Sequence, residues 1–339
     1  MRTWIAAGLI AGLAALAVAA DDKPKDKPPM KPADVAINPA QAGPDFALQG
    51  EYAGELASKE KLGVQVLANG DGAFTARMLR GGLPGDGWNG KDQKKFEGKL
   101  ENGKVVFGDD RGKATLADGK ITLTVGDEAV TLPKVTRKSS TEGKAPPTGA
   151  IVLFDGKNLD NWTKQDRKSP AAWLVRDDGV MQVKGGDILT KEKFGSFTLH
   201  VEFMLPFMPK ARGQGRANSG VYVQNRFELQ VLDSFALKGL DNEAGGFYKA
   251  YDPAVNMCYP PLQWQTYDVD YTAPKFASGK KTTNARCTVK HNGVVVQDNV
   301  ELKGPSPGGE PETDTPDGIR LQDHGNPVMY RNLWAIEKK

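Results

Sequence analysis

The chain has 339 residues, 39% of them apolar and 26% charged, which is the composition of an ordinary globular protein with room for two domains. Its 45 basic and 42 acidic residues leave a net charge of +3. So small an excess, without a basic stripe, gives no reason to expect nucleic acid or an anionic membrane as a partner.

The chain begins with MRTW and the apolar run IAAGLIAGLAALAVAA, which ends in small residues before Asp21. This run is shorter than the roughly 20 residues of a membrane span, and its small residues suit cleavage. Residues 1–20 are therefore predicted to be a signal peptide, with no membrane span after cleavage; an uncleaved anchor is the alternative. We expect an exported protein, in the periplasm or the extracellular medium.

Residues 21–45 are rich in Pro, Lys and Asp and are predicted to be a disordered tether. Residues 46–138 then show short β-like runs separated by turn dipeptides such as Asn102-Gly103 and Asp118-Gly119. Such turns predict hairpins, and their succession predicts a small all-β meander or barrel of unknown role.

Residues 139–149 are predicted to be a linker, and residues 150–339 again read as strand after strand. The strands are predicted over residues 151–154, 173–176, 180–183, 197–203, 220–223, 227–232, 266–271, 285–290, 294–297, 318–321 and 328–336. About eleven strands in this length predict a two-sheet sandwich, so the whole chain is predicted to be all-β. The irregular stretches 234–263 and 303–317 are predicted to be loops that shape a ligand site.

Two cysteines, Cys258 and Cys287, are the only ones in the chain. An exported protein could join them in a disulfide, and two buried free thiols are the alternative.

The segment NSGVYVQNRFELQVLD carries charge inside an apolar, strand-like run. Side chains alternate along a strand, so Glu228 and Gln230 point away from the core face. Asp233 has the wrong parity for that face, but one β-bulge would return it there and give two carboxyls at one site.

Five pieces of the C-terminal half, LFDGKNLDNW, NSGVYVQNRFELQVLD, WQTYDVDYTAP, NGVVVQDN and LQDHGNPVMYRNLW, together resemble the 3-keto-disaccharide hydrolase domain family. The resemblance covers about residues 149–339. It implies a concanavalin A-like jelly-roll sandwich with a carbohydrate-facing sheet, and hence a sugar-cleaving enzyme.

The run ELQVLD also resembles the E-x-D-x-x-E strand of laminarinase-type glucanases, in which the outer acids are nucleophile and acid/base. Here Glu228 and Asp233 take those positions and Gln230 replaces the central acid. An amide cannot tune neighbouring carboxyls as an acid does, and Asp233 is one methylene shorter than Glu, so ordinary retaining hydrolysis is disfavoured.

A 3-keto sugar permits a different route, because its C3 carbonyl acidifies the proton on C2. Abstraction of that proton, loss of the C1 substituent and addition of water require a base, a stabiliser for the enolate and an acid. We expect Glu228 as base, His324 or Arg331 as stabiliser and Asp233 as acid; the reverse assignment of base and acid stays open.

Further residues are candidates for binding the substrate. They are Gln230, Asn218, Tyr222, Tyr248, Arg331, and the pair His200 and Glu202, which share a strand face. With Glu228 and His324, that pair could hold a divalent metal, but the chain has no compact metal motif, so neither a metal nor another cofactor is expected.

Two alternatives stay open at this point. One is a conventional two-carboxylate glucanase acting on unoxidised glycans. The other is a non-catalytic carbohydrate-binding module on the same sandwich.

Overall fold

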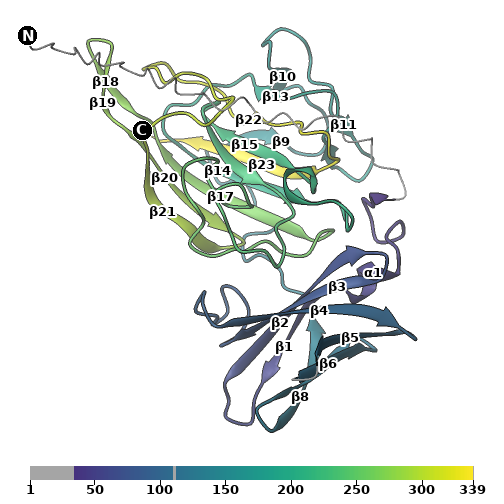
Figure 1. The fold of residues 1–339 in the computed structure, drawn as a ribbon. Helices are drawn as coiled ribbons and strands as arrows, with labels where there is room; N and C mark the ends of the chain where they lie inside the picture. Colours follow the sequence, from purple (N-terminus) through teal and green to yellow (C-terminus); the bar gives the residue numbers. More distant parts are fainter. Residues whose placement is uncertain (1–33, 110–111, 339) are drawn as a thin grey trace, which may run out of the picture. The chain divides into compact units, whose positions relative to one another are not determined.

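The computed structural model describes residues 34–109 and 112–338 (Figure 1). The predicted signal peptide and most of the predicted tether lie outside the described residues. The last residues of the tether are structured, contrary to expectation: Ala36 pairs with Phe207, and the helix α1 (Pro44–Leu48) follows, starting at a proline. Proline suits a first helical position because the N–H that it lacks would have no partner there.

The first β unit is a closed antiparallel barrel in which each strand pairs with the next and the last pairs with the first (Figure 1). Its strands are β1 (Gly50–Glu55), β2 (Lys61–Gly70), β3 (Ala73–Arg80), β4 (Gln93–Glu101), β5 (Lys104–Asp109), β6 (Gly112–Ala117), β7 (Lys120–Val125) and β8 (Glu128–Val135). The predicted turns are confirmed: Asn102 and Gly103 have φ of 49° and 79°, and Asp118 and Gly119 have φ of 49° and 69°. Positive φ at both central residues is what a two-residue hairpin loop requires.

One end of the barrel is closed by α1. The helix residues Phe46 and Leu48 pack against the barrel core, and the Tyr52 hydroxyl donates to the Leu48 carbonyl at 2.7 Å. Phe207 joins the same cluster and meets Phe46 edge to face. The apolar interior is therefore sealed from water at this end.

The second β unit is a sandwich. Its five-stranded sheet runs in the order β10 (Trp162–Lys164), β13 (Ile188–Thr190), β22 (Arg320–Leu321), β15 (Ser219–Val223) and β16 (Phe227–Val231). Its eight-stranded sheet contains β11 (Leu174–Val175), β12 (Met181–Gln182), β23 (Met329–Glu337), β14 (Phe197–Met204), β17 (Trp264–Thr272), β20 (Ala285–His291) and β21 (Val294–Leu302), with β9 (Ile151–Phe154) beside β23. A separate hairpin joins β18 (Lys275–Ala277) to β19 (Lys280–Thr283), and a 3₁₀ turn, η2, spans Gly213–Gly215.

The core of the sandwich lies between the two sheets. Val221, Leu229 and Leu321 come from the five-stranded sheet, whereas Val201 and Phe203 come from the eight-stranded one, and all five are fully buried. The alternation read from the sequence therefore assigned the core faces of these strands correctly. The predicted all-β chain, a small barrel followed by a sandwich, is confirmed.

The predicted linker is packed against the eight-stranded sheet. Ser139 and Thr141 exchange hydrogen bonds with Thr266 at 2.6 and 2.8 Å, and the Gly143 N–H donates to Glu202 at 2.6 Å. These contacts bury polar atoms of the sheet that would otherwise face water.

Cys258 and Cys287 are buried free thiols rather than a disulfide. Burial raises the pKa of the Cys258 thiol to about 12, so it stays protonated and unreactive near neutral pH.

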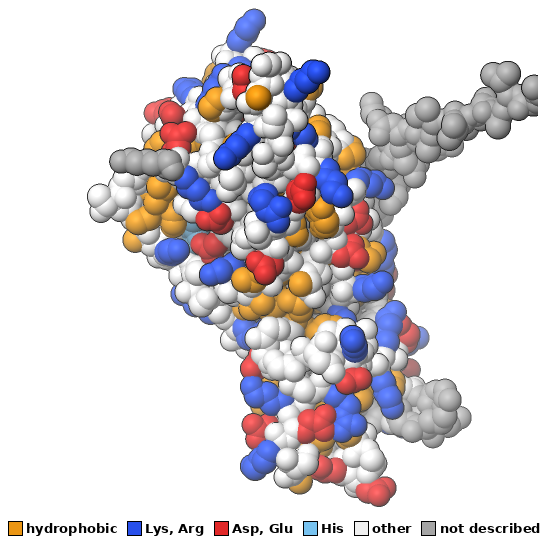
Figure 2. Space-filling model, turned by 90° about the vertical axis from the view of Figure 1, so that its left-hand side faces the viewer, with side chains coloured by type: hydrophobic (Ala, Val, Ile, Leu, Met, Phe, Trp, Pro, Cys, Tyr) orange, Lys and Arg blue, Asp and Glu red, His pale blue; other side chains and the backbone are white. Residues whose placement is uncertain are grey.

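Basic and acidic side chains are interspersed over the face seen in Figure 2, in keeping with the small net charge. Within residues 34–109 and 112–338, no helix is both long and apolar enough to cross a membrane.

Candidate active site

A row of three polar side chains crosses the five-stranded sheet on the face turned away from the core. Glu228 on β16 lies opposite Tyr222 on β15, and Tyr222 lies opposite Arg320 on β22. The alternating parity of these strands places the three on one face, because Val221, Leu229 and Leu321 point into the core. The sequence predicted Glu228 and Tyr222 on this face and missed Arg320.

Glycine at position 220 makes room for the Glu228 side chain. A Cβ atom at Gly220 would lie 2.8 Å from Glu228 Oε1, closer than non-bonded atoms approach. The glutamate therefore folds back over β15, toward Tyr222.

Glu228 is only 4% exposed. The Tyr222 hydroxyl donates to its Oε2 at 2.9 Å, and no donor among the described residues reaches Oε1. Burial raises the pKa of the Glu228 carboxyl to about 7, although the Tyr222 hydrogen bond and the Arg320 charge both act to lower it. Such a carboxyl can both take and return a proton near neutral pH, as a general acid/base must.

Arg320 and Asp187 stand next in this row. The Arg320 guanidinium lies 3.7 Å from the centre of the Tyr222 ring and donates to the Gly308 carbonyl at 2.7 Å. Its Nε is 3.6 Å from Asp187 Oδ2, too far for a hydrogen bond. Burial also raises the pKa of Asp187, a carboxyl whose side chain is 20% exposed.

Several buried polar atoms on this face have no hydrogen-bond partner among the described residues. They are Arg320 Nε, Gln322 Oε1 and Gln230 Oε1. Leaving a buried polar atom unpaired costs about 1–3 kcal/mol, so water or a bound ligand has to complete the bonding of these three atoms.

Gln230 and Asn218 extend the polar face away from Glu228. Gln230 Nε2 donates to Asn218 Oδ1 at 3.0 Å and to Gln214 Oε1 at 3.1 Å. The structure thus brings both predicted residues together with Gln214, which the sequence analysis missed.

Two of the predicted loops touch Glu228 through its backbone. The Glu228 N–H donates to Ser306 Oγ at 3.0 Å, and the Tyr248 N–H donates to the Glu228 carbonyl at 3.0 Å. Tyr248, a predicted substrate-binding residue that is half-buried, therefore lies beside the edge of this sheet.

His324 is exposed and lies near Asp187. A positive charge on His324 acts to lower the pKa of Asp187. The turn that carries it is anchored by Asn326, whose Oδ1 accepts the Asn218 N–H at 2.7 Å. Asp323 is tied to the same region, since its N–H donates to Asp187 Oδ1 at 2.9 Å.

Asp233 does not share this face, so its predicted pairing with Glu228 is wrong. β16 ends at Val231 without the expected bulge, and Asp233 is fully buried. Its Oδ2 accepts a hydrogen bond from Arg216 Nε at 2.7 Å, and both side chains are almost completely shielded from water. This carboxyl balances a buried cation.

His200, Glu202 and Arg331, predicted as substrate-binding residues, all lie on the eight-stranded sheet, so the structure does not bring them together with Glu228. Burial alone would raise the pKa of Glu202, but hydrogen bonds from His200, Asn332 and Arg331 lower it to about 2. Burial would likewise lower the pKa of His200, but Asp268 at 2.9 Å and Glu202 at 3.4 Å raise it.

No group of three or more His, Cys, Asp or Glu side chains is close enough to hold a metal ion in the part of the chain that the structure describes. The four residues considered for a metal, His200, Glu202, Glu228 and His324, are divided between the two sheets or lie on separate segments.

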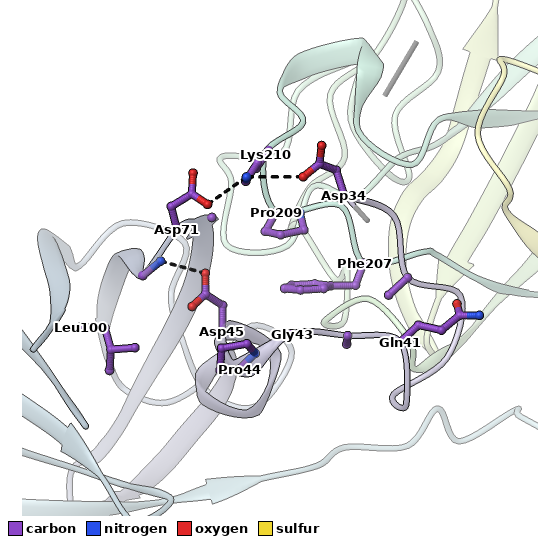
Figure 3. Close-up of a pocket in the computed structure, with 14 residues that line it drawn as sticks. Asp34, Gln41, Gly43, Pro44, Asp45, Asp71, Leu100, Phe207, Pro209 and Lys210 are labelled. Atoms are coloured by element: carbon purple, nitrogen blue, oxygen red, sulfur yellow. Dashed lines mark hydrogen bonds and ion pairs between the residues drawn. The ribbon is translucent and has the colours of Figure 1, made fainter. Parts of the chain in front are cut away.

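A cavity of about 440 Å³ lies elsewhere, between α1, the β2–β3 turn and residues 207–210 (Figure 3). Its charged groups are paired: Lys210 Nζ is 2.8 Å from Asp71 and 3.4 Å from Asp34, and Asp45 accepts the Gly72 N–H. It lacks the unpaired polar atoms found around Glu228.

Comparisons with known proteins bear on residues 149–336, which match the family described as the 3-keto-alpha-glucoside-1,2-lyase-like domain. A crystal structure of a "putative glycosyl hydrolase" from Parabacteroides distasonis ATCC 8503 is 37% identical, covers 57% of this chain and 85% of its own, and superposes with a TM-score of 0.54. A second structure with that description, from the same organism, is 20% identical, covers 56% of this chain and 94% of its own, and has a TM-score of 0.43. A third is 21% identical, covers 56% of this chain and 99% of its own, and has a TM-score of 0.38. A search of curated proteins found no match.

The matched segment contains the whole five-stranded sheet and every member of the Glu228 row. It also spans more than half of the chain. The chain therefore belongs to the 3-keto-alpha-glucoside-1,2-lyase-like domain family, a carbohydrate-active family.

Proposed function

We propose that the sandwich cleaves 3-keto-glycosides, with Glu228 as the base that removes the proton from C2. The observation that carries this proposal is a buried carboxyl with a pKa of about 7, flanked by a hydroxyl donor and a guanidinium. A base is most effective when its pKa lies near the working pH. The family's description as lyase-like agrees with an elimination.

The remaining roles follow from the charges around Glu228. As the C2 proton moves to Glu228, negative charge develops on the C3 oxygen, and the Arg320 guanidinium stabilises it through its unpaired Nε. The C1–O bond then breaks, and we assign protonation of the leaving oxygen to Asp187, with His324 beside it. Water then adds to C1 of the enone and gives a proton back to Asp187, and Glu228 returns a proton to C2, so the sum is hydrolysis.

Substrate binding falls to the polar face next to Glu228. The unpaired oxygens of Gln230 and Gln322 accept hydrogen bonds from sugar hydroxyls, and the half-buried Tyr248 supplies an aromatic surface beside them. The apolar N-terminal run of residues 1–20 supports the further proposal that the enzyme is exported.

The test incubates the purified chain with a 3-keto-α-glucoside disaccharide and with its unoxidised parent, in H₂O and in D₂O. We expect cleavage of the keto sugar alone, deuterium at C2 of the product, and a kcat/KM that rises with pH through an apparent pKa of about 7. Glu228→Gln should lower the turnover at least about 10²-fold. The matched control, Glu310→Gln, changes an exposed glutamate and should be neutral.

Other outcomes favour the alternatives. Cleavage of the parent sugar without incorporation of deuterium would indicate a conventional glucanase. Binding of both sugars with no turnover, unchanged in Glu228→Gln, would indicate a carbohydrate-binding module.

A further inference from the structure

A turn formed by residues 306–309, in the predicted loop 303–317, packs on the row that contains Glu228. The Gly309 N–H closes the turn by donating to the Ser306 carbonyl at 2.8 Å, and the Ser306 N–H donates to the Arg226 carbonyl at 2.9 Å. A Cβ atom at Gly309 would overlap the Arg226 carbonyl oxygen, so this close approach requires glycine. Backbone contacts at the start of β16 therefore hold the turn in place.

The Tyr222 hydroxyl lies between this turn and Glu228. Its oxygen is 2.9 Å from Glu228 Oε2 and 3.2 Å from the Pro307 carbonyl oxygen, and both of these atoms are acceptors. A phenol has a single proton, so Tyr222 can donate to only one of them at a time. Gln322 Nε2, at 3.5 Å, is a donor and offers no third choice.

The ring of Tyr222 is fixed. It is 2% exposed, and the Arg320 guanidinium covers it at 3.7 Å from the ring centre. Burial raises the pKa of the Tyr222 hydroxyl, so the tyrosine keeps its proton near neutral pH. What can change is the direction in which that proton points.

The preferred direction depends on the charge of Glu228. Hydrogen bonds to an ionised acceptor are about twice as strong as those between neutral groups, so a Glu228 carboxylate is a better acceptor than the Pro307 peptide carbonyl. A neutral carboxyl is a poorer acceptor than a peptide carbonyl, and its own O–H can donate to the Tyr222 oxygen. Protonation of Glu228 therefore favours the bond from Tyr222 to Pro307.

Other charged and titratable groups on or next to this face come from three places. They are Arg320 on β22, Asp187 before β13 with its neighbours Asp323 and His324, and Tyr248 in the loop 234–263. Residues 306–309 carry no ionisable side chain. Among the described residues, Tyr222 alone donates a hydrogen bond to the Glu228 carboxyl.

We propose that Tyr222 is a positioning residue whose hydroxyl proton follows the ionisation of Glu228, pointing at Glu228 Oε2 when the carboxyl is charged and at the Pro307 carbonyl when it is neutral. The inference rests on the proposed function, in which Glu228 passes through both states in each turnover. The O–H group only rotates about the phenol C–O bond, and no covalent bond breaks. Without this donor, burial would keep Glu228 protonated, and no base would be available at neutral pH.

Carbon-13 NMR of the purified chain without substrate tests the two positions of the proton. In protein labelled at glutamate Cδ, the resonance that disappears in Glu228→Gln identifies Glu228. Its titration midpoint should rise by at least about one pH unit in Tyr222→Phe, because a bond to a charged acceptor is lost.

A second label reports the other position. In protein labelled at the proline carbonyl carbon, the Pro307 resonance is assigned by its loss in Pro307→Ala. In the wild type it should shift with pH at the same midpoint as Glu228, and in Tyr222→Phe it should stay constant. The wild-type signal keeps the test valid even if Tyr222→Phe does not fold.

Turnover of the 3-keto sugar separates this role from a merely structural one. At pH 6, kcat/KM of Tyr222→Phe should be about tenfold lower than that of the wild type, since a smaller fraction of Glu228 is ionised. At pH 9 the difference should shrink to about threefold or less, because Glu228 is then largely ionised in both proteins. An equal loss at every pH would indicate a structural defect and overturn the proposal.

Tyr52→Phe is the matched control, because Tyr52 is also a buried tyrosine that donates to a backbone carbonyl, but in the barrel. It should leave both midpoints unchanged, and melting temperatures show that each variant is folded. An unchanged Glu228 midpoint in folded Tyr222→Phe, or a Pro307 resonance that does not titrate in the wild type, would overturn the proposal. Both NMR shifts without turnover of the keto sugar would instead overturn the proposed function and leave the two hydroxyl positions established.

Discussion

The two sheets of the sandwich each bury a glutamate on the face turned away from the core, in opposite electrostatic surroundings. Glu202, on the eight-stranded sheet, accepts hydrogen bonds from Gly143, Arg331 and Asn332, which hold its pKa at about 2 against the effect of burial. Glu228, on the five-stranded sheet, accepts one from Tyr222, and burial raises its pKa to about 7.

The contrast distinguishes a glutamate that stabilises the fold, Glu202, from one that is suited to proton transfer, Glu228. A carboxylate with all its bonds made stabilises the fold and has no reason to exchange a proton. A carboxyl left short of partners, beside other unpaired polar atoms, costs stability, and proteins accept that cost at functional sites. Substitution of Glu202 should therefore change mainly stability, whereas substitution of Glu228 should change turnover and the pH dependence of stability.

The largest effect on stability is expected from Asp233→Asn, which leaves Arg216 as a buried charge without its counter-ion. Removal of one partner of a buried ion pair costs about 3–5 kcal/mol, and both side chains here are at most 3% exposed. Urea denaturation measures this loss, with Asp298→Asn, at an exposed position, as the control. Turnover of the folded fraction should stay within about threefold of wild type; a stable but inactive variant would return Asp233 to the active site.

Next in size is the pH dependence that Glu228 contributes to stability. Its pKa is about 7 in the folded protein, against 4.5 for an unperturbed glutamate. The folded state holds this proton more tightly, so the contribution is fully present below pH 4.5 and is lost as pH rises to about 7. The pKa difference corresponds to about 3 kcal/mol.

Denaturation of wild type and Glu228→Gln between pH 4 and 9 isolates this contribution. Because the amide does not titrate, the variant should gain on the wild type by up to about 3 kcal/mol across that window. Parallel curves for the two proteins would show that Glu228 titrates normally.

Gly220→Ala should act on turnover more than on stability. The added Cβ would meet Glu228 Oε1 at 2.8 Å and push the carboxyl out of position. Displacement by about 1 Å can cost 10²-fold in rate, so we expect a loss of about that size in kcat on the 3-keto substrate. Gly304→Ala, where a Cβ meets nothing within 4 Å, is the matched control, and equal activity of the two variants would contradict the assigned role.

The smallest effect is expected from Glu202→Gln. The substitution weakens the bonds to Arg331 and His200, but Arg331 is 32% exposed and water screens part of the loss. We expect destabilisation by about 2 kcal/mol in urea, with kcat unchanged. A large loss of kcat at full stability would mean that Glu202 takes part in the reaction, contrary to the structural role assigned to it.

Much of this architecture could be predicted from the sequence because it depends on the alternation of apolar and polar residues along each strand. The core faces of β14, β15 and β16 follow directly from the parity of Val201, Val221 and Leu229. Parity also excluded Asp233 from the face of Glu228, and the error lay in invoking a bulge to bring it back.

What could not be predicted depends on which strands become neighbours. β13 has only three residues, too few for a periodic signal, so Asp187 just before it was missed. Arg320 has the correct parity within its strand, between Ile319 and Leu321, but nothing local shows that β22 pairs with β15. For His200 and Glu202 the parity was read correctly, but nothing local shows that their strand and the strand of Glu228 belong to different sheets.

The segment that leads into the sandwich has a practical consequence for dissecting the protein. The family match begins at residue 149, which suggests a truncation there. Yet Ser139, Thr141 and Gly143 supply hydrogen bonds to Thr266 and Glu202. A fragment starting at residue 149 would expose these partners to solvent and fold poorly. One starting at residue 138 would carry its own covering strip and should fold better, although it would leave Phe207 without its barrel partner Phe46.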